Sequence, residues 1–241
     1  MPPQEPSFTP DVLERGAERD GKRQEMNRRL FMQLLGFECE TPQDAVAQLG
    51  EALDAAGAGA VIYEDVNDPH GLAVVSFSED PTDFVTKTRR AVQAVDGLRP
   101  KPELSMLGRT YSTGYEPDLE YWLLARPVET AKNPEWPWAV WYPLRRSGDF
   151  EKLEPREKGG ILREHATIGK AYGQLDLAHD IRLACHGLDA NDNEFVIGLV
   201  GKELHPLSHV VQTMRRTRQT SEFIVQMGPF FVGHCVWRSR A

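Results

Sequence analysis

A single histidine stands on the apolar side of a predicted helix, Glu154–Tyr172. Pro155 suits the first turn of that helix, where the amide hydrogen that proline lacks would have no partner. Apolar residues recur every three or four positions, which places His165 in one row with Ile161 and Ile168. A neutral imidazole on a rigid helix is a good metal ligand, whereas a core histidine that donates a hydrogen bond to a carbonyl is the ordinary alternative. The spacing alone leaves both open.

A tyrosine and two arginines stand at the end of a predicted strand, Trp138–Arg145. Tyr142 and Arg146 are four residues apart, so they would share one face if the strand continues through Pro143. Guanidinium groups bind carboxylates through paired hydrogen bonds, which makes Arg145 and Arg146 candidates for holding an acidic group. The alternative is a packing tyrosine followed by a solvated basic pair.

Composition and length are those of an ordinary globular protein. The 241 residues can form one large domain or two small ones, and 40% of them are hydrophobic and 27% charged. The net charge of −8 argues against a general nucleic-acid-binding protein but not against a small anionic substrate. Three cysteines without a CxxC spacing favour a reducing compartment. With no apolar run of roughly 18 residues and no signal-peptide pattern, we expect a cytoplasmic protein without membrane contact.

The elements that must position these side chains follow one order twice. In the first half, helices are expected after Thr41-Pro42 and from Pro81 onward. Strand patterns occur at Arg28–Glu38, Val61–Val66, Leu72–Phe77 and Leu104–Thr113. The resulting order, β-α-β-β-α-β, defines a ferredoxin-like unit.

The second half repeats this order. The helix that carries His165 is followed by one that Pro206 opens. Strands are predicted at Trp138–Arg145, Ile181–His186, Glu194–Val200 and Phe223–Val236. We therefore predict an α+β fold in which two ferredoxin-like β-α-β-β-α-β repeats form a dimeric-α+β-barrel-type domain with the helices outside.

The predicted organisation has four parts. A poorly ordered N-terminal arm is expected over 1–22 and the N-terminal ferredoxin-like half over 23–114. An irregular, aromatic-rich connector over 115–136 leads to the C-terminal half over 137–241.

Several short motifs of the second half occur in an order that resembles the chlorite dismutase-like family. They are Trp141-Tyr142-Pro143-Leu144-Arg145-Arg146, Glu164-His165 with Gly169 and Tyr172, Gly187-Leu188-Asp189 with Glu194-Phe195, and Gly228-Pro229-Phe230-Phe231. In the first half the resemblance is limited to element order and Leu107-Gly108-Arg109. The family includes chlorite dismutases and coproheme decarboxylases. The resemblance therefore implies an iron porphyrin, haem b or coproheme, in the C-terminal half.

The resemblance also implies roles for the candidate residues. His165 would be the proximal iron ligand. Tyr142 matches the tyrosine that coproheme decarboxylases oxidise to a radical near a propionate. Arg146 matches their catalytic lysine or arginine, with Arg145 as a second propionate anchor.

The resemblance leaves two positions open: the distal residue above the iron and the hydrogen-bond partner of the proximal histidine. Counting back from Phe195 places Arg182 where chlorite dismutases keep a distal arginine, which would stabilise an anionic ligand. Counting forward from His165 requires an insertion and makes Asp180 the competing residue. The family often pairs the proximal histidine with a carboxylate; in the matching stretch Glu222 is one candidate, whereas position 220 aligns best.

Three functions stay open. Tyr142, Arg145 and Arg146 favour the first, a haem-dependent oxidoreductase that decarboxylates coproheme with peroxide. A chlorite-degrading, oxygen-releasing enzyme would use His165 and Arg182. The third is a porphyrin-binding barrel without turnover, because a fold does not fix a function. Expected partners are small molecules (peroxide, coproheme or an oxyanion), and the resemblance implies a homopentamer.

Overall fold

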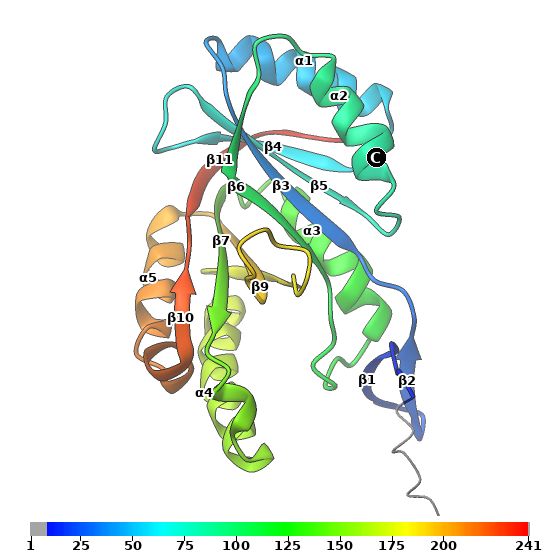
Figure 1. Cartoon of the computed structure of the whole chain (residues 1–241), viewed down its shortest axis with the longest axis vertical. Coiled ribbons are helices and arrows are strands. Elements are labelled where there is room, and N and C mark those ends of the chain that lie inside the picture. The colour runs from blue at the N-terminus through cyan, green and yellow to red at the C-terminus, as the bar shows by residue number, and fades with distance from the viewer. Residues whose placement is uncertain (1–8, 241) are drawn as a thin grey trace, which may run out of the picture.

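A nine-stranded antiparallel sheet closes into a barrel in a computed structural model that describes residues 9–240 (Figure 1). Its strands are β3 (Phe31–Glu38), β4 (Ala60–Asp65), β5 (Gly71–Ser78), β6 (Arg99–Arg109), β7 (Trp138–Arg146), β8 (His179–Ala184), β9 (Phe195–Gly201), β10 (Ile224–Met227) and β11 (Phe231–Arg238). The barrel closes because β7 pairs with β11 on one side and with β9 on the other.

Each half of the chain contributes the strand order of a ferredoxin-like unit. The first half runs β4-β5-β3-β6 across the sheet, and the second runs β11-β7-β9-β8. The halves meet where β11 pairs with β4 and where β6 pairs with β8. The predicted fold class, two β-α-β-β-α-β repeats in one α+β barrel, is confirmed.

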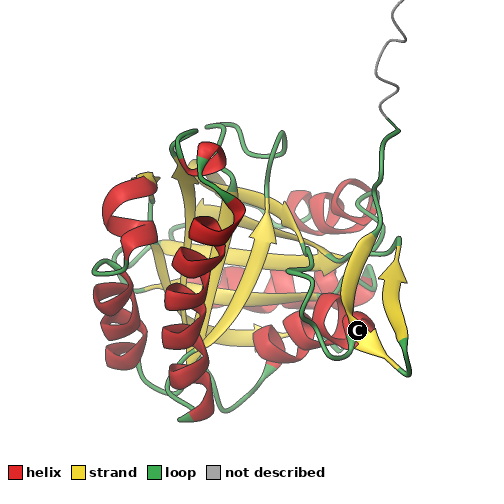
Figure 2. Cartoon of the chain, turned by 90° about the horizontal axis from the view of Figure 1, so that it is seen from below, coloured by secondary structure: helices red, strands yellow, loops and turns green. Residues whose placement is uncertain are grey.

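Four helices cover the outer faces of the two halves (Figure 2). They are α1 (Pro42–Ala55), α2 (Arg89–Gln93), α4 (Pro155–Gln174) and α5 (Leu204–Met214). The first helix begins at Thr41-Pro42 as predicted and buries Leu49 and Leu53. The helices α4 and α5 lie together over the second half, where α4 contacts β8 and α5 contacts β7 and β9.

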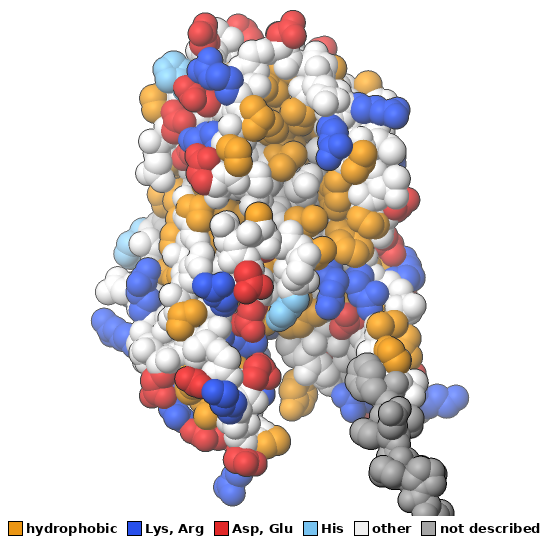
Figure 3. All heavy atoms as spheres, in the orientation of Figure 1, with side chains coloured by type: hydrophobic (Ala, Val, Ile, Leu, Met, Phe, Trp, Pro, Cys, Tyr) orange, Lys and Arg blue, Asp and Glu red, His pale blue; other side chains and the backbone are white. Residues whose placement is uncertain are grey.

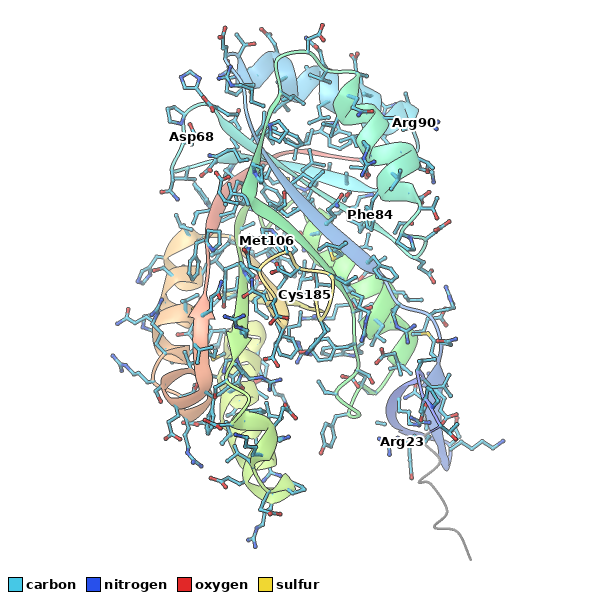
Figure 4. The ribbon with its side chains drawn as sticks, viewed as in Figure 1. Arg23, Asp68, Phe84, Arg90, Met106 and Cys185 are labelled. Atoms are coloured by element: carbon cyan, nitrogen blue, oxygen red, sulfur yellow. The ribbon has the colours of Figure 1, made fainter. Side chains whose placement is uncertain are left out.

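Alternation along the strands fills the barrel interior with apolar side chains. Trp141, Tyr63 and Phe231 are among its fully buried members. Met106 and Cys185, which Figure 4 labels, belong to the same interior cluster. Since every second residue of a strand points inward, the residues between them project outward beneath the helices.

The prediction of an irregular connector is wrong over residues 121–132. This stretch forms a π-helical turn, Tyr121–Ala125, and then α3 (Arg126–Lys132). Leu123 and Ala131 join the interior cluster of the barrel. The π-turn breaks the 3.6-residue apolar period by which helices are predicted, and Pro127 is tolerated only because it lies in the first turn of α3.

The expected N-terminal arm is in part a hairpin, made of β1 (Glu14–Arg19) and β2 (Lys22–Met26). Asp20 and Gly21 form its turn, both with positive φ (53° and 74°). An Asp-Gly pair is typical of two-residue hairpin turns, but the charged strands beside it hide the usual alternation. Residues 1–8 of the arm lie outside the described residues.

The predicted closing strand is divided. A π-helical turn, Gln219–Phe223, precedes β10, and Gly228 with a φ of 99° separates β10 from β11. A left-handed φ of this kind is readily adopted only by glycine. The closing segment therefore bends next to the end of β7, with which β10 pairs.

The outer surface mixes charges of both signs. Figure 3 shows acidic and basic side chains intermingled on one face, with apolar side chains between them. Among residues 9–240, no helix has both the length and the apolar character that a bilayer crossing requires.

Substitution of Gly198 by alanine should destabilise the barrel. An alanine Cβ would lie 2.6 Å from ring atoms of Trp141, which is packed inside. We expect the free energy of unfolding to fall by about 1–3 kcal/mol, as in overpacked cores, measured by urea denaturation. Gly160→Ala is the matched control: nothing lies within 4 Å of its added Cβ, so a gain of about 0.5–1 kcal/mol is expected inside α4. Equal effects would contradict the packing argument.

Candidate functional site

The outer face of the second half is covered less completely than that of the first. The helix α1 buries four of its 14 residues, whereas α4 buries only Ile161 of its 20. Yet α4 has an apolar row in which Ile168 and Tyr172, beyond His165, are only partly buried. A partly exposed apolar row lacks part of its partner. The outer face of the second half, where α4 lies, is therefore a candidate site for an apolar ligand.

Two candidate residues lie in one row across this face. In the strand register Tyr142 of β7 pairs with Ile197 of β9, and Ile197 pairs with Arg182 of β8. Paired residues project from the same face, and neighbouring strands are about 4.8 Å apart, so Tyr142 and Arg182 stand roughly 10 Å from each other. The next row contains Val140, Leu199 and Asp180.

Tyr142 is a buried phenol on the outward side of β7. Its side chain is 6% exposed and its ring stacks on Phe230, with the ring centroids 4.6 Å apart. Burial raises the pKa of the phenol, although the charge of Arg215 acts in the opposite direction. The hydroxyl is therefore protonated at neutral pH. Pro143 does not interrupt the strand, as Tyr142 and Arg146 both lie within β7.

His165 lies on the sheet-facing side of α4. Its Nδ1 atom is buried and has no hydrogen-bond partner within residues 9–240. A core histidine tied to a carbonyl through this nitrogen, the alternative from the sequence, is thus not observed. Burial and then the charge of Arg182 lower the pKa of His165, while Asp180 opposes them. The imidazole is neutral near pH 7, which is the form that binds metals.

Arg182 and Asp180, the two competing distal residues, are both present on the same face. They are joined by an ion pair in which Arg182 Nε lies 2.9 Å from Asp180 Oδ2. Each side chain keeps about a third of its surface accessible, 36% and 38%. Both charges are close enough to shift the pKa of His165, so the structure brings these three residues together.

The arginine pair at the end of β7 is split between two faces. Arg146, on the side of Tyr142, is only 10% exposed, and its Nε donates to Glu194 Oε2 at 3.0 Å. Its guanidinium lies over the rings of Phe150 and Phe195, 4.2 and 4.8 Å from their centroids. The charge of Arg146 is thus already matched by a carboxylate.

Arg145 points the other way, since neighbouring residues of a strand face opposite sides. Its Nη2 donates to Gln226 Oε1 at 3.1 Å and its Nη1 lies 3.5 Å from Asp192 Oδ2. The structure therefore does not bring Arg145 to Tyr142.

Arg215 is a candidate that the sequence argument missed. It follows the last residue of α5, is exposed, and its Nη2 contacts the sulfur of Met227 at 3.9 Å. Its charge acts on the phenol of Tyr142, and no carboxylate pairs with it in the described part of the chain. A basic residue at a helix C-terminus is ordinary, so its sequence position carried no functional signal.

Gln219 is a second residue that was missed. Its Oε1 is buried without a hydrogen-bond partner in the described range. Of the two positions proposed for a partner of His165, Thr220 hydrogen bonds to Thr217, and Glu222 pairs with Arg218 at 2.8 Å.

The π-turn that contains Gln219 is docked on α4. The backbone N–H of Arg218 donates to Glu164 Oε2 at 3.1 Å, next to His165, and Phe223 packs with Ile161. Gln219 Oε1 and His165 Nδ1, both buried and without a hydrogen-bond partner in the described range, thus belong to two segments that contact each other.

A family model described as chlorite dismutase matches residues 70–236. The chain belongs to the chlorite dismutase family. This confirms the resemblance found in the sequence, and the match includes every candidate site residue. No curated protein matches the chain.

Solved structures similar to the chain share its fold. A haem-binding protein from Thermus thermophilus has a TM-score of 0.68 at 17% identity, covering 87% of this chain and 92% of that one. A mutant chlorite dismutase from Candidatus Nitrospira defluvii has a TM-score of 0.66 at 13% identity, with coverages of 88% and 93%. The same organism's chlorite dismutase in complex with imidazole has a TM-score of 0.65 at 14% identity, with coverages of 88% and 93%. At these identities the similarity shows the fold alone.

The site fits the iron porphyrin that the chlorite dismutase family implies. Within residues 9–240 no three histidine, cysteine or carboxylate side chains are grouped to hold a bare metal ion. A porphyrin supplies four ligands itself, so one axial histidine is sufficient. His165, a neutral imidazole on a helix, fits that role, and its buried Nδ1 is left to a second partner. The partly exposed apolar row on α4 fits a flat apolar ring.

Replacement of Asp180 by asparagine should remove a pH-dependent part of the stability. Although burial opposes ionisation, Arg182 and Arg126 hold the pKa of the Asp180 carboxyl below its usual 3.8. A lowered folded-state pKa stabilises the protein above about pH 3.8, and this contribution is lost as the pH falls through the folded value. Wild type should exceed Asp180→Asn by about 1 kcal/mol at pH 7, since partial exposure screens the pairs.

Urea unfolding at a series of pH values checks this. The difference between the two proteins should shrink as the pH falls below 3.8. A difference that stays constant from pH 7 down to that range would contradict the ionised state of Asp180.

Proposed function

We propose that the chain is a haem-dependent oxidoreductase that decarboxylates coproheme with peroxide, in the formation of haem b. The observation that carries this proposal is that a buried phenol, Tyr142, and a neutral helix-borne imidazole, His165, belong to the same outer side of the second half, where the apolar row of α4 is only partly buried. Family membership supports an iron porphyrin there, and the described fold supports its place between α4 and the sheet.

In this proposal His165 binds the iron through one ring nitrogen, and the apolar outward residues Val140, Leu144 and Leu199 contact the ring. Arg215, without a carboxylate partner in the described part, is available to hold a propionate near Tyr142. Arg146 can do so only if it gives up part of its bond to Glu194. When bound, the iron porphyrin supplies the redox chemistry with peroxide.

The reaction removes two electrons from each propionate. One propionate, one hydrogen peroxide and one proton give one vinyl group, one carbon dioxide and two waters, so atoms and charge balance. Tyr142 loses an electron and its hydroxyl proton and then regains a hydrogen atom from the propionate side chain. Burial that keeps this phenol protonated until then supports its role.

Chlorite degradation is the second candidate, and Arg182 is the observation that favours it. Its guanidinium shares the outer face with Tyr142 and acts on His165. A fixed cation beside the iron would stabilise an anionic oxychlorine ligand. A porphyrin-binding barrel without turnover is the third. A homopentamer, implied by the family resemblance, and a cytoplasmic location, expected from the cysteine pattern, belong to the same proposal.

Haem binding should depend on His165. His165→Ala should abolish the five-coordinate spectrum of the loaded protein, because α4 has no second histidine to bind the iron in its place. Absorption and the iron–histidine Raman stretch measure this. His205→Ala, an exposed histidine of α5, is the control and should bind as wild type does. A His165→Ala protein that keeps the wild-type Soret band would refute the assignment.

Tyr142→Phe and Arg182→Ala should separate the two reactions. For a decarboxylase, Tyr142→Phe should bind coproheme normally but stop at four propionates when peroxide is added, and Arg182→Ala should matter little. For a chlorite dismutase, loss of a charge-assisted contact of about 1.5–3 kcal/mol at Arg182 should slow turnover by roughly one to two orders of magnitude, with Tyr142→Phe nearly silent. Mass analysis of the porphyrins and oxygen release are the measurements.

If Tyr142→Phe and Arg182→Ala both match wild type with coproheme and with chlorite, both reactions are excluded. The porphyrin-binding barrel without turnover would then be the better proposal.

Gln219 should tune the iron through His165. An amide oxygen accepts the Nδ1 proton less strongly than a carboxylate does, so Gln219→Glu should raise ligand basicity. We expect a higher iron–histidine stretching frequency and a lower reduction potential. Thr220→Val is the control and should change neither. Unchanged values in Gln219→Glu would show that this amide does not reach the imidazole.

A further inference from the structure

Arg182 is not free to act on a ligand by itself, because Asp180 holds it. The two residues are on the same strand, β8, and on the same outward face, two positions apart. Their ion pair, 2.9 Å from Nε to Oδ2, uses one carboxylate oxygen. A carboxylate that faces a single arginine would cancel its charge.

Asp180 is shared with a second arginine from outside the repeats. Nη2 of Arg126, at the start of α3, donates to Asp180 Oδ1 at 2.9 Å, and its Nη1 donates to the Asp180 carbonyl oxygen at 2.9 Å. The guanidinium of Arg126 also lies over the ring of Trp122, 4.6 Å from its centroid. A cation held at three points has little freedom to leave.

Arg126, Asp180 and Arg182 together carry one net positive charge, since two guanidiniums face one carboxylate. On its other side Arg182 lines, with Tyr111, Glu116 and Arg126, a small cavity of about 20 Å³. That volume is close to the space of one water molecule. The carboxylate of Glu116 is already occupied by the turn at residues 113–115, whose backbone N–H groups donate to it.

We propose that Arg126 is a positioning residue for Arg182: by taking one oxygen and the carbonyl of Asp180, it loosens the hold of Asp180 on Arg182 and leaves the face with one net positive charge for an anionic ligand. The inference rests on the proposed haem site for its purpose but not for its geometry. The affinity for small anions is then set by a helix of the connector rather than by the barrel strands.

Azide binding to the full-length ferric protein loaded with haem b tests the proposal. Arg126→Gln leaves Asp180 to Arg182 alone, so azide should bind about tenfold more weakly, the scale of one charge-assisted contact. Asp180→Asn should bind azide at least as tightly as wild type. The double variant should return toward the wild-type affinity, because its net charge is again one.

Two controls separate positioning from simple charge. Arg90→Gln removes the same charge from the exposed side of α2, in the first half, and should leave azide affinity unchanged. In an Arg182→Ala background, Arg126→Gln should have little further effect. An equal loss of affinity with and without Arg182, or no loss at all, would overturn the proposal. Imidazole, a neutral ligand, should bind all these variants alike.

A haem-free measurement keeps the inference decidable if haem does not bind. The carboxyl of Asp180 can be titrated by carbon NMR in the full chain. Arg126→Gln and Arg182→Gln should each raise its midpoint, because each removes a cation that favours the ionised carboxylate. An unchanged midpoint in Arg126→Gln would refute the shared carboxylate. Failure to bind haem would overturn the proposed function alone.

Discussion

Side-chain alternation on a closed sheet determines where a ligand can bind in this protein. Because the sheet has no free edge along most of its circumference, each strand residue points either into the barrel or toward the helices. The inward positions hold large apolar groups such as Trp141 and Phe231, both fully buried. The outward positions beneath α4 and α5 remain, and Tyr142, the neighbour of Trp141, is one of them.

The same alternation decides which charges act on that face. Arg146 and Arg145 are adjacent in sequence but belong to opposite sides of β7, and each has a polar partner of its own. The row from Tyr142 through Ile197 to Arg182 then places a phenol and a guanidinium one strand apart on either side of an apolar residue. The residues proposed for the two candidate reactions thus share this row, and the charges around it act on both proposals.

Much of the fold could be predicted from the sequence, because the strands and helices of both repeats have strong periodic patterns and clear turn or proline signals. The place of His165 in the apolar row of its helix could be predicted from residue spacing alone. The separation of Arg145 from Arg146 also follows from strand alternation. The prediction that both arginines hold propionates did not take this alternation into account. Arg126, Arg215 and Gln219 could not be found in this way. They lie in a short helix, at a helix end and in a π-turn, and only the closed barrel brings these segments to the second half.

The two repeats share a topology but differ in how well their helices cover the sheet, and the reason lies in helix composition. The helix α1 presents Leu49 and Leu53 to the sheet and is fully docked. The helix α4 contains four glycines, at 159, 160, 169 and 173, each of which weakens a helix by up to about 1 kcal/mol relative to alanine. Such a helix depends on tertiary contacts for its order, yet only Ile161 is fully buried. If a ligand binds beside α4 as proposed, it supplies the missing contacts, and its binding at His165 is then energetically coupled to the order of α4.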